Sequence, residues 1–359
     1  MSHSVIAEID LEALHYNLAK IKEIANSRKV LAMVKSNAYG HGLVEIASSL
    51  QAKVDAFGAM CVDEALKLRA SGINKPIVIL SGFIDQEELE VIDRYHLEVV
   101  VHNFNQLTIL EKSNLQNPLK VWLKIDTGMH RLGFQPFEVQ QAYQRLMSVE
   151  KVIKKLFFIT HFSDADDIKN PKTAAQLATF ENITANLEGT RSLSNSAAIL
   201  NWPGAHADWI RPGITLHGVS PLTGKTGLDL GFKPVMTFSS RLIAIHDLEA
   251  GDTVGYGSTW ECKAPTRIGI VAAGYGDGYP RSCKNGTPIL INGVRCPLIG
   301  RVAMDMTTVD LSALPNAKIG DQVILWGRGL PVEEIALAAN TIPYELFCRM
   351  TTRVHYKYK

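Results

Sequence analysis

Short apolar runs alternate with amphipathic stretches along the first two-thirds of the chain. The runs are rich in Val, Ile and Phe and occur at eight places: 29–35, 56–60, 76–82, 97–102, 120–126, 156–162, 191–196 and 208–218. The stretch from Asp10 has apolar residues at positions 11, 14, 18, 21 and 24, which is the spacing of one helix face. A second helix is predicted from Asp63, a good N-cap residue, to Gly72.

This alternation predicts the fold class of the first part of the chain. Strands that are apolar throughout and are joined by helices indicate a parallel sheet with both faces covered. Eight such strand–helix units favour an α/β fold with a (β/α)8 TIM-like barrel over an open sheet.

The pattern changes near Gly231. From there to about Gly327, apolar runs are separated by turn-like clusters such as EAGD, KNGT and KIGD, which is typical of a β-rich domain. Two helices are predicted to close the chain, the first starting at Pro331. We therefore expect a barrel over residues 1–230 and a mainly β domain over residues 231–359.

Composition and charge narrow the function classes. The net charge of +1 and the lack of a basic run argue against nucleic acid and anionic membranes as partners. No apolar run is long enough to span a bilayer, and the N-terminus lacks a secretory signal pattern. Five cysteines without a C-x-x-C pair argue against a disulfide framework or a zinc site and favour a reducing compartment. The expectation is a cytoplasmic protein with no metal.

Polar side chains follow several of the predicted strands, where a barrel places its active site. Lys35 ends the first run, although an ammonium group is costly to bury, and a lysine that reaches back to solvent is the ordinary alternative. Asn37, Tyr39 and His41 come close behind Lys35 after the same run. The later strand ends supply Lys124, Asp126, His130 and Arg131 after the fifth strand; His161, Ser163, Asp164 and Asp166 after the sixth; Asn195 and Ser196 after the seventh; and Arg211 and Gly213 after the eighth.

These residue types suit a phosphorylated cofactor that carries a carbonyl group. A lysine amine forms a Schiff base with an aldehyde. The loops after strands seven and eight are the usual phosphate site of a barrel. There, Ser196 stands at a predicted helix start, and the backbone N–H groups of Gly213 and Ile214 follow a tight turn. Pyridoxal phosphate fits this set, although a capping serine and an ordinary turn explain the same residues taken singly.

Over nearly its whole length the sequence resembles the alanine racemases. The motifs that carry the resemblance are AMVKSNAYGHG, KIDTGMHRLGF, THFSDAD, NSAA and RPGI, followed in the second domain by VGYGSTW, GYGDGYPR and GRVAMDM. Their number and order make the resemblance specific. It implies a (β/α)8 barrel followed by a β domain, and pyridoxal-phosphate-dependent interconversion of L-alanine and D-alanine. We expect the D-alanine to serve peptidoglycan synthesis, and alanine catabolism stays open.

The resemblance also implies roles for individual residues. Two of them are catalytic bases: Lys35, which also holds the cofactor as a Schiff base and acts on D-alanine, and Tyr256, which acts on L-alanine. Seven residues are implied to bind the cofactor. Four lie at its phosphate, one at its pyridine nitrogen and two nearby: Tyr39, Ser196, Gly213 and Ile214; Arg211; and His161 and Asn195. His161 would also link Tyr256 to Arg211. Substrate carboxylate would bind Arg131 and the backbone N–H of Met304. Lys124 is a candidate for carbamylation that orients Arg131, and an access corridor would be lined by Asp166, Tyr275 and Arg281.

Because Tyr256 and Met304 lie in the second domain, the resemblance implies a head-to-tail homodimer in which each site is shared by two chains. The sequence departs from the family at two positions. Thr352 stands where a tyrosine often reaches the phosphate, and His217 stands where a tyrosine is usual; we interpret His217 as a packing residue.

Four other functions remain open at this point. A decarboxylase of basic amino acids shares the barrel and the lysine, but it usually has a carboxylate at the pyridine nitrogen, where Arg211 stands here. A non-catalytic pyridoxal phosphate carrier lacks a second domain like the one that follows Gly231 here. A racemase of broad specificity and an inactive relative are the other two.

Overall fold

The computed structural model describes residues 5–359, which form two compact units. The barrel unit contains residues 18–216 and 221–224, and the β unit contains residues 5–17, 217–220 and 225–359. Residues 5–17 therefore belong to the same unit as residues 225–359. The single boundary between residues 230 and 231 stays a prediction. Among the described residues, no helix is both long and apolar enough to cross a bilayer.

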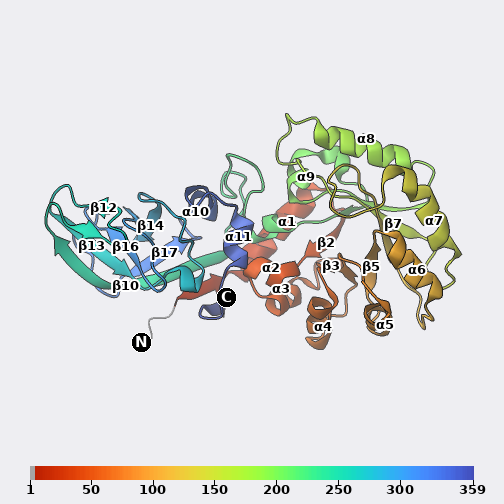
Figure 1. Ribbon diagram of the computed structural model, residues 1–359, viewed down its shortest axis with the longest axis horizontal. Coiled ribbons are helices and arrows are strands. Elements are labelled where there is room, and N and C mark those ends of the chain that lie inside the picture. The colour runs from red at the N-terminus through yellow and green to blue at the C-terminus, as the bar shows by residue number, and fades with distance from the viewer. Residues whose placement is uncertain (1–4) are drawn as a thin grey trace. The chain divides into compact units, whose positions relative to one another are not determined.

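Eight parallel strands close the barrel, which confirms the predicted (β/α)8 fold (Figure 1). The strands are β2 (Lys29–Met33), β3 (Ala56–Ala59), β4 (Ile77–Ile79), β5 (Glu98–Val101), β6 (Val121–Lys124), β7 (Leu156–Ile159), β8 (Gly189–Ser192) and β9 (Trp209–Ile210). Closure occurs where β2 pairs with β9, with Lys29 opposite Trp209. Each strand overlaps one predicted run. Every strand is shorter than the predicted run, most of all β9, because the chain leaves the sheet at Ile210 and turns into the loops of the site. β8 also begins two residues before its predicted run and ends at Ser192.

Helices surround the barrel strands (Figure 1). Those along this part of the chain are α1 (Leu11–Ile24), α3 (Leu43–Leu50), α4 (Val62–Ala70), α5 (Gln86–Arg94), α6 (Phe104–Lys112), α7 (Val139–Ser148), α8 (Lys172–Thr184) and α9 (Ser196–Asn201). Short 3-10 helices are η1 (Pro136–Glu138), η2 (Pro203–Ala205), η3 (Ile214–His217) and, in the β unit, η4 (Tyr275–Asp277).

The predicted start of α4 at Asp63 is wrong. Cys61 occupies the N-cap position with extended backbone and makes no side-chain cap, while Asp63 and Glu64 lie in the first turn. Carboxylates in a first turn favour a helix through its dipole, so the same residue supports the helix from inside it. The helix ends at Ala70, two residues before Gly72, whose φ of +84° is the left-handed conformation common after a helix.

The β unit is built on one sheet of eight strands, which confirms the mainly β second part. They are β1 (Ile6–Ile9), β10 (Met236–Leu248), β13 (Thr266–Val271), β14 (Pro288–Ile291), β15 (Val294–Pro297), β16 (Thr307–Asp310), β17 (Gln322–Trp326) and β18 (His355–Tyr358). A separate hairpin pairs β11 (Thr253–Val254) with β12 (Trp260–Glu261), and α10 (Val332–Ala338) and α11 (Pro343–Cys348) precede β18.

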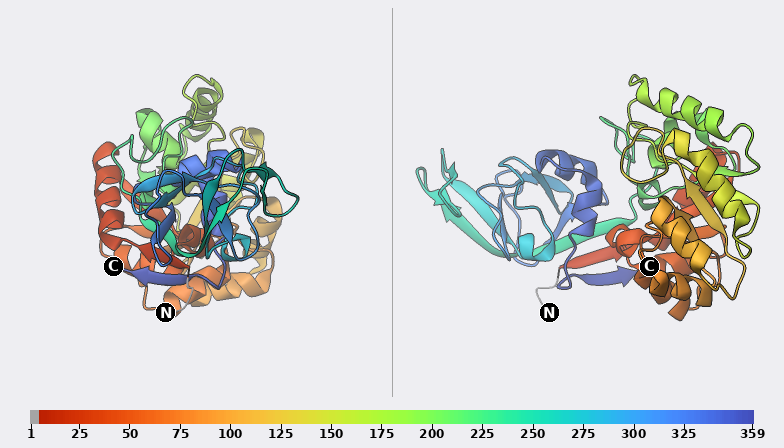
Figure 2. Two further views of the ribbon diagram at one scale, coloured as in Figure 1. Left: turned by 90° about the vertical axis from the view of Figure 1, so that its left-hand side faces the viewer. Right: turned by 45° about the vertical axis from the view of Figure 1, so that its right-hand side comes forward.

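The sequence did not predict β1 or β18. β1 pairs antiparallel with β10 and parallel with β18, with Ile6 opposite His355, so the first and last strands lie side by side (Figure 2). Each of these strands has only four residues and no turn signal beside it, so its sequence pattern is too short to predict the pairing.

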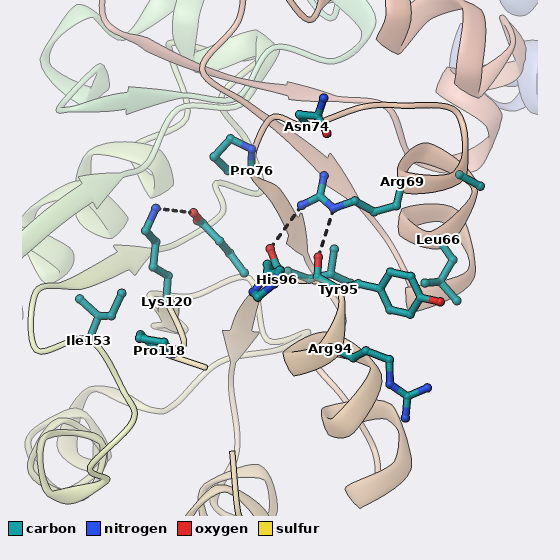
Figure 3. A pocket seen from close by; sticks show the side chains of 13 residues that line it. Leu66, Arg69, Asn74, Pro76, Arg94, Tyr95, His96, Pro118, Lys120 and Ile153 are labelled. Carbon is teal, nitrogen blue, oxygen red and sulfur yellow. Dashed lines mark hydrogen bonds and ion pairs between the residues drawn. The ribbon is translucent and has the colours of Figure 1, made fainter. Parts of the chain in front are cut away.

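A cavity of about 910 Å³ opens at the N-terminal ends of β4 to β6, beside α4 and α5 (Figure 3). Its main charged groups are already paired. Lys120 Nζ lies 3.0 Å from the carboxylate of Glu98, whose other oxygen accepts a hydrogen bond of 2.8 Å from Trp122 Nε1. The guanidinium of Arg69 donates to the carbonyl oxygens of Tyr95, Ile73, Lys75 and His96 at 2.8–3.3 Å. These contacts satisfy the main charged groups at this end of the barrel.

Arg69 should therefore be a stability residue. Arg69→Lys keeps the charge but cannot bridge four carbonyl groups, so we expect unfolding in urea to require about 2 kcal/mol less free energy. Arg94→Lys is the matched control: this neighbouring arginine lines the same cavity, and its side chain makes no hydrogen bond or ion pair within residues 5–359. Equal stability of the two variants would contradict the bridging role.

Candidate active site

Four positive side chains gather at the C-terminal ends of the barrel strands. Burial has the largest effect on Lys124, and the charges of Arg211, Arg131 and Lys35 add to it, so that the pKa of Lys124 falls from 10.5 to about 8. Asp126 opposes this shift and is the one carboxylate with a marked effect. A concentration of like charge destabilises a fold unless ligands offset it, so the mouth suits anionic ligands.

Lys35 follows β2 at the start of an unusual turn. In the segment α2 (Lys35–Gly40), residues 36–39 all have φ between 51° and 54° and ψ between 43° and 54°, which is a left-handed helical turn. Each non-glycine residue in this conformation costs about 1–2 kcal/mol. Side-chain hydrogen bonds help to hold it: Glu64 accepts from Ser36 N at 2.6 Å, and Asn37 Oδ1 accepts from Leu43 N at 2.9 Å. Strain that the surroundings maintain in this way is typical of functional sites.

Three hydroxyl groups and a backbone N–H converge near the end of β9. Ser196 Oγ accepts a hydrogen bond of 2.9 Å from Gly213 N and lies 3.1 Å from Thr215 Oγ1. A Cβ at position 213 would overlap the hydroxyl of Tyr39, so only glycine lets that hydroxyl approach the backbone. All four residues are buried, as is the next residue of the turn, Ile214. This set of donors can hold a phosphate group. Because α9 has only six residues, the side chains matter more than its dipole.

Arg211 is buried at the end of β9 and fixed by three acceptors. Its Nη1 donates to Ser192 Oγ at 2.8 Å, and its Nη2 donates to the carbonyl oxygens of Thr160 and Leu193 at 2.6 and 3.0 Å. Burial lowers the pKa of Arg211 to about 9, which leaves it charged at neutral pH. Its Nε donates to no group of residues 5–359 and can face a ligand.

His161 follows β7 within the field of these cations. Burial has the largest effect and the charges of Arg211, Arg131, Lys124 and Lys35 add to it, so that the pKa of His161 lies well below its usual value. The imidazole is therefore neutral at neutral pH, when it can accept a proton on one nitrogen and donate from the other.

Arg131 lies on a tight loop after β6. Asp126 Oδ1 organises this loop by accepting hydrogen bonds of 3.0 Å from Gly128 N and His130 N. A Cβ on Gly133, where φ is +132°, would lie 2.6 Å from Asp126 N, so the loop requires glycine there. The guanidinium of Arg131 is exposed and makes no hydrogen bond or ion pair with any residue that the structure describes. It is available to bind a carboxylate.

Two further residues of the barrel unit have structural contacts of their own. Asn195 is the N-cap of α9: its Oδ1 accepts from Ala198 N at 3.0 Å, and its Nδ2 donates to the carbonyl oxygen of Phe162 at 3.4 Å. Asp166 lies in the loop after β7, where its carboxylate is 3.5 Å from Thr223 Oγ1. Their roles at a cofactor and an access corridor stay predictions.

The remaining predicted residues belong to the β unit, and three of them surround one turn. Tyr275 N donates to the carbonyl oxygen of Ala303 at 3.1 Å, and Gly276 N donates to that of Met304 at 2.8 Å. The guanidinium carbon of Arg281 lies 5.6 Å from the centre of the Tyr275 ring. The sequence separates these residues by up to 29 positions, and the fold brings them together.

Tyr256 is 67% exposed on a turn whose neighbours Gly255, Gly257 and Ser258 all have positive φ. A Cβ on Gly257 would lie 3.2 Å from the guanidinium of Arg301, so this turn packs against the segment that leads to Met304. The four predicted residues of the β unit thus share one region of it. That they form one site with the barrel residues stays a prediction.

Sequence reasoning missed two contributors to the barrel site. Thr215 gave a usable signal, because it stands two positions after Gly213 in the motif RPGIT. Ser192 gave none, because a serine within a strand is unremarkable. The two departures from the family pattern differ in setting: Thr352 is exposed, whereas His217 is buried.

Comparisons with known proteins agree along the whole chain. The family models for the N-terminal and C-terminal domains of alanine racemase match residues 9–221 and 235–358. The biosynthetic alanine racemase of Escherichia coli K12 is 49% identical over 351 residues, which is 98% of each chain. The crystal structure of the biosynthetic alanine racemase from Pseudomonas aeruginosa has 43% identity, a TM-score of 0.97 and full coverage of both chains. That of the alanine racemase from Bartonella henselae, described with covalently bound pyridoxal phosphate, has 29% identity, a TM-score of 0.90 and full coverage of both chains.

Lys124 should make stability depend on pH. Its pKa is about 8 in the folded chain and near 10.5 when unfolded. Between these values the unfolded chain binds more protons, so the free energy of unfolding rises with pH across this window. In carbonate-free buffer, Lys124→Met should be more stable than the parent at pH 7 and should lose most of this slope in urea titrations. The exposed Lys155 provides the control, Lys155→Met, and a slope that persists in Lys124→Met would contradict the lowered pKa.

Proposed function

The chain belongs to the alanine racemase family, and on this premise we propose that it interconverts L-alanine and D-alanine with pyridoxal phosphate and two opposed bases. Membership makes the chain an isomerase that acts on alanine. The observation that carries the finer proposal is that hydroxyl and N–H donors, a buried arginine and Lys35 gather at one end of the barrel.

The residues present fit pyridoxal phosphate. Tyr39, Ser196 and the backbone N–H groups of Gly213 and Ile214 would hold the phosphate, and Arg211 would face the pyridine nitrogen. Lys35 would bond to the aldehyde carbon. The cationic mouth offsets the charge of the phosphate, and the relative from Bartonella henselae is described with this cofactor bound covalently. When bound, pyridoxal phosphate withdraws electrons from the substrate and makes its Cα–H acidic.

Two bases are needed because racemisation removes a proton from one face of Cα and returns one to the other. A single base tends to return the proton to the face it came from. Tyr256 would remove the proton from L-alanine and Lys35 the proton from D-alanine, each group returning it in the opposite direction. A free phenol, with a pKa of about 10, is mostly protonated at neutral pH, so a tyrosine base needs a partner that takes up its proton. The neutral His161 would hydrogen-bond to Tyr256 and link it to Arg211.

Arg131 would bind the substrate carboxylate, with the backbone N–H of Met304 as a second donor. Its guanidinium is exposed and unpaired within residues 5–359, as a ligand-binding arginine should be. Lys124 would orient it as a carbamate. Carbon dioxide bonds to the nitrogen of a neutral amine, which releases one proton to water, and the pKa of about 8 leaves part of Lys124 in that neutral form at physiological pH. Asp166, Tyr275 and Arg281 would line the access corridor.

A head-to-tail homodimer would complete each site. Tyr256 and Met304 are 67% and 52% exposed in their own chain, which leaves both accessible to a partner. A partner chain would then present both residues to the barrel mouth of the other chain.

We propose that the product supplies peptidoglycan synthesis. The relatives from Escherichia coli and Pseudomonas aeruginosa are both described as biosynthetic.

A decarboxylase is less consistent with the site, because the position that would face the pyridine nitrogen holds a guanidinium rather than a carboxylate. Thr352 makes the phosphate end the place where this chain would differ from relatives that carry a tyrosine.

The activity is tested by incubating the purified protein and pyridoxal phosphate with each enantiomer of a panel of amino acids. Alanine should racemise fastest, and Lys35→Ala should lower kcat by about 10²–10⁴-fold or more, as loss of a catalytic base does. Borohydride should fix the cofactor to the peptide that contains Lys35. Lys29, at the other end of β2, is the internal control. Label on Lys29, or no racemisation of any amino acid, would contradict the proposal.

Shared sites predict that two dead chains can complement each other. Lys35→Ala and Tyr256→Phe should each be inactive alone. After mixing and re-equilibration, about a quarter of the parental activity should return, because half of the dimers are hybrids with one complete site of two. The control repeats the mixing with two Lys35→Ala preparations, which should stay inactive. If the mixed chains form hybrid dimers that have no activity, each site belongs to one chain.

A further inference from the structure

His102 lies beside Lys124 in the barrel wall. Val101, the last residue of β5, pairs with Leu123 of β6, so the next residues of the two strands, His102 and Lys124, are adjacent. Side chains alternate along a strand, so His102 shares a face with Glu98, and Lys124 shares one with Trp122. Glu98 and Trp122 are buried and hydrogen-bonded to each other across the two strands. His102 and Lys124 thus continue the same face towards the mouth.

The hydrogen bonds of His102 define one tautomer. Its Nε2 lies 2.9 Å from the carbonyl oxygen of Ser81, which can only accept, so Nε2 carries the proton. Its Nδ1 lies 3.2 Å from Asn103 Nδ2, an amide nitrogen that can only donate, so Nδ1 presents a lone pair. The amide nitrogen Nε2 of Gln106 also lies 3.3 Å from His102 Nε2, but the shorter contact with the Ser81 carbonyl oxygen assigns the proton to Nε2. The neutral Nε2–H form thus satisfies the contact of Nδ1 and the shorter contact of Nε2.

The amide of Asn103 cannot rotate without a loss elsewhere. Asn103 is the N-cap of α6, and its Oδ1 accepts a hydrogen bond of 2.9 Å from Gln106 N. Gln106 in turn accepts from His102 N through Oε1 at 2.8 Å and donates from Nε2 to the carbonyl oxygen of Phe83 at 3.0 Å. Turning the Asn103 amide would remove the helix cap, because the amide nitrogen cannot accept the hydrogen bond from Gln106 N. The start of α6 therefore fixes the donor that faces His102.

Protonation of His102 would bring an N–H group against the amide NH₂ of Asn103. Burial has the largest effect and lowers the pKa of His102; the hydrogen bond with the Ser81 carbonyl oxygen opposes this shift, and the nearby charge of Lys124 adds to it, so that the pKa lies below its usual value. The other groups that contact the ring, from the end of β4 and from α6, are uncharged. Geometry and charge thus favour the same state, a neutral imidazole beside Lys124.

We infer that His102 is a positioning residue for the modified Lys124 side chain. Because His102 stays neutral, Arg131 remains the charged group to which that side chain is directed. This inference rests on the proposed function, in which a carbamate on Lys124 orients Arg131 for the substrate carboxylate. A cationic imidazole beside Lys124 would form a competing ion pair with the carbamate and draw it away from Arg131. The Asn103 amide prevents that competition by excluding a proton from Nδ1.

The test reverses the polarity at Nδ1 while keeping the helix cap. Asn103→Asp retains an N-cap acceptor as good as asparagine but places a carboxylate oxygen against Nδ1, which favours the protonated ring. We expect ¹⁵N NMR of histidine-labelled protein, assigned with His102→Gln, to report a neutral Nε2–H ring in the parent at neutral pH and a protonated ring in Asn103→Asp at the same pH. The KM for both enantiomers of alanine should rise about tenfold with little change in kcat, the signature of weakened carboxylate binding.

Asn103→Ser is the matched control, because it keeps a capping hydroxyl and adds no charge. Its KM should stay within about twofold of the parent value. If Asn103→Asp does not fold or does not charge the ring, a second pair of variants tests the same point. His102→Gln places a neutral side chain beside Lys124, and His102→Lys places a charged one there. In that pair, only the lysine variant should raise KM.

A parent His102 that titrates as an ordinary imidazole, or a charged residue 102 with unchanged KM, would overturn the inference. A parent protein without racemase activity would instead overturn the proposed function, and the NMR measurement would still report whether Asn103 keeps His102 neutral. A fall in kcat and stability with unchanged KM in every variant would assign His102 to the packing of the barrel alone.

Discussion

The burial of the Arg211 guanidinium among fixed acceptors is the interaction on which the barrel site depends. Three strand ends meet there, because Thr160 follows β7, while Ser192 and Leu193 lie at the end of β8 and Arg211 follows β9. A buried cation without such partners would cost several kcal/mol. With them it becomes a permanent positive charge, and it also sets the course of the backbone into the turn that presents Gly213 N to Ser196.

That permanent charge determines the protonation states around it. Lys124 and His161 both lie in its field, and burial and neighbouring cations lower the pKa of each. Groups that ordinarily carry a proton are thereby moved towards neutral forms, which can accept protons or react with carbon dioxide. His102 belongs to the same pattern, with the difference that hydrogen-bond geometry adds to the effect of charge. The mouth is thus a place where cations are fixed and their neighbours are kept neutral.

The two ends of the barrel use charged residues in opposite ways. At the N-terminal end, Glu98 is paired with Lys120 and Trp122, and Arg69 is surrounded by carbonyl groups, so the charges there close the fold. At the C-terminal end, Arg131 has no partner among the described residues, and the turn after Lys35 is strained. Unsatisfied donors and local strain mark the end where ligands complete the structure.

The sequence by itself determined the eight barrel strands, the β-rich second part and the motifs of the family, because apolar runs and turn clusters are local signals that recur along the chain. It also located most residues of the candidate site, since polar side chains at strand ends converge once a barrel is assumed. Tertiary structure alone decided the rest. The pairing of β1 with β18 joins residues that lie about 350 positions apart. The left-handed turn at residues 36–39 exists because Glu64 and Leu43 hold it. The neutral state of His102 depends on contacts with the start of α6, the segment after β4 and the neighbouring strand β6. These elements are separate in the sequence, so no local pattern encodes their contacts.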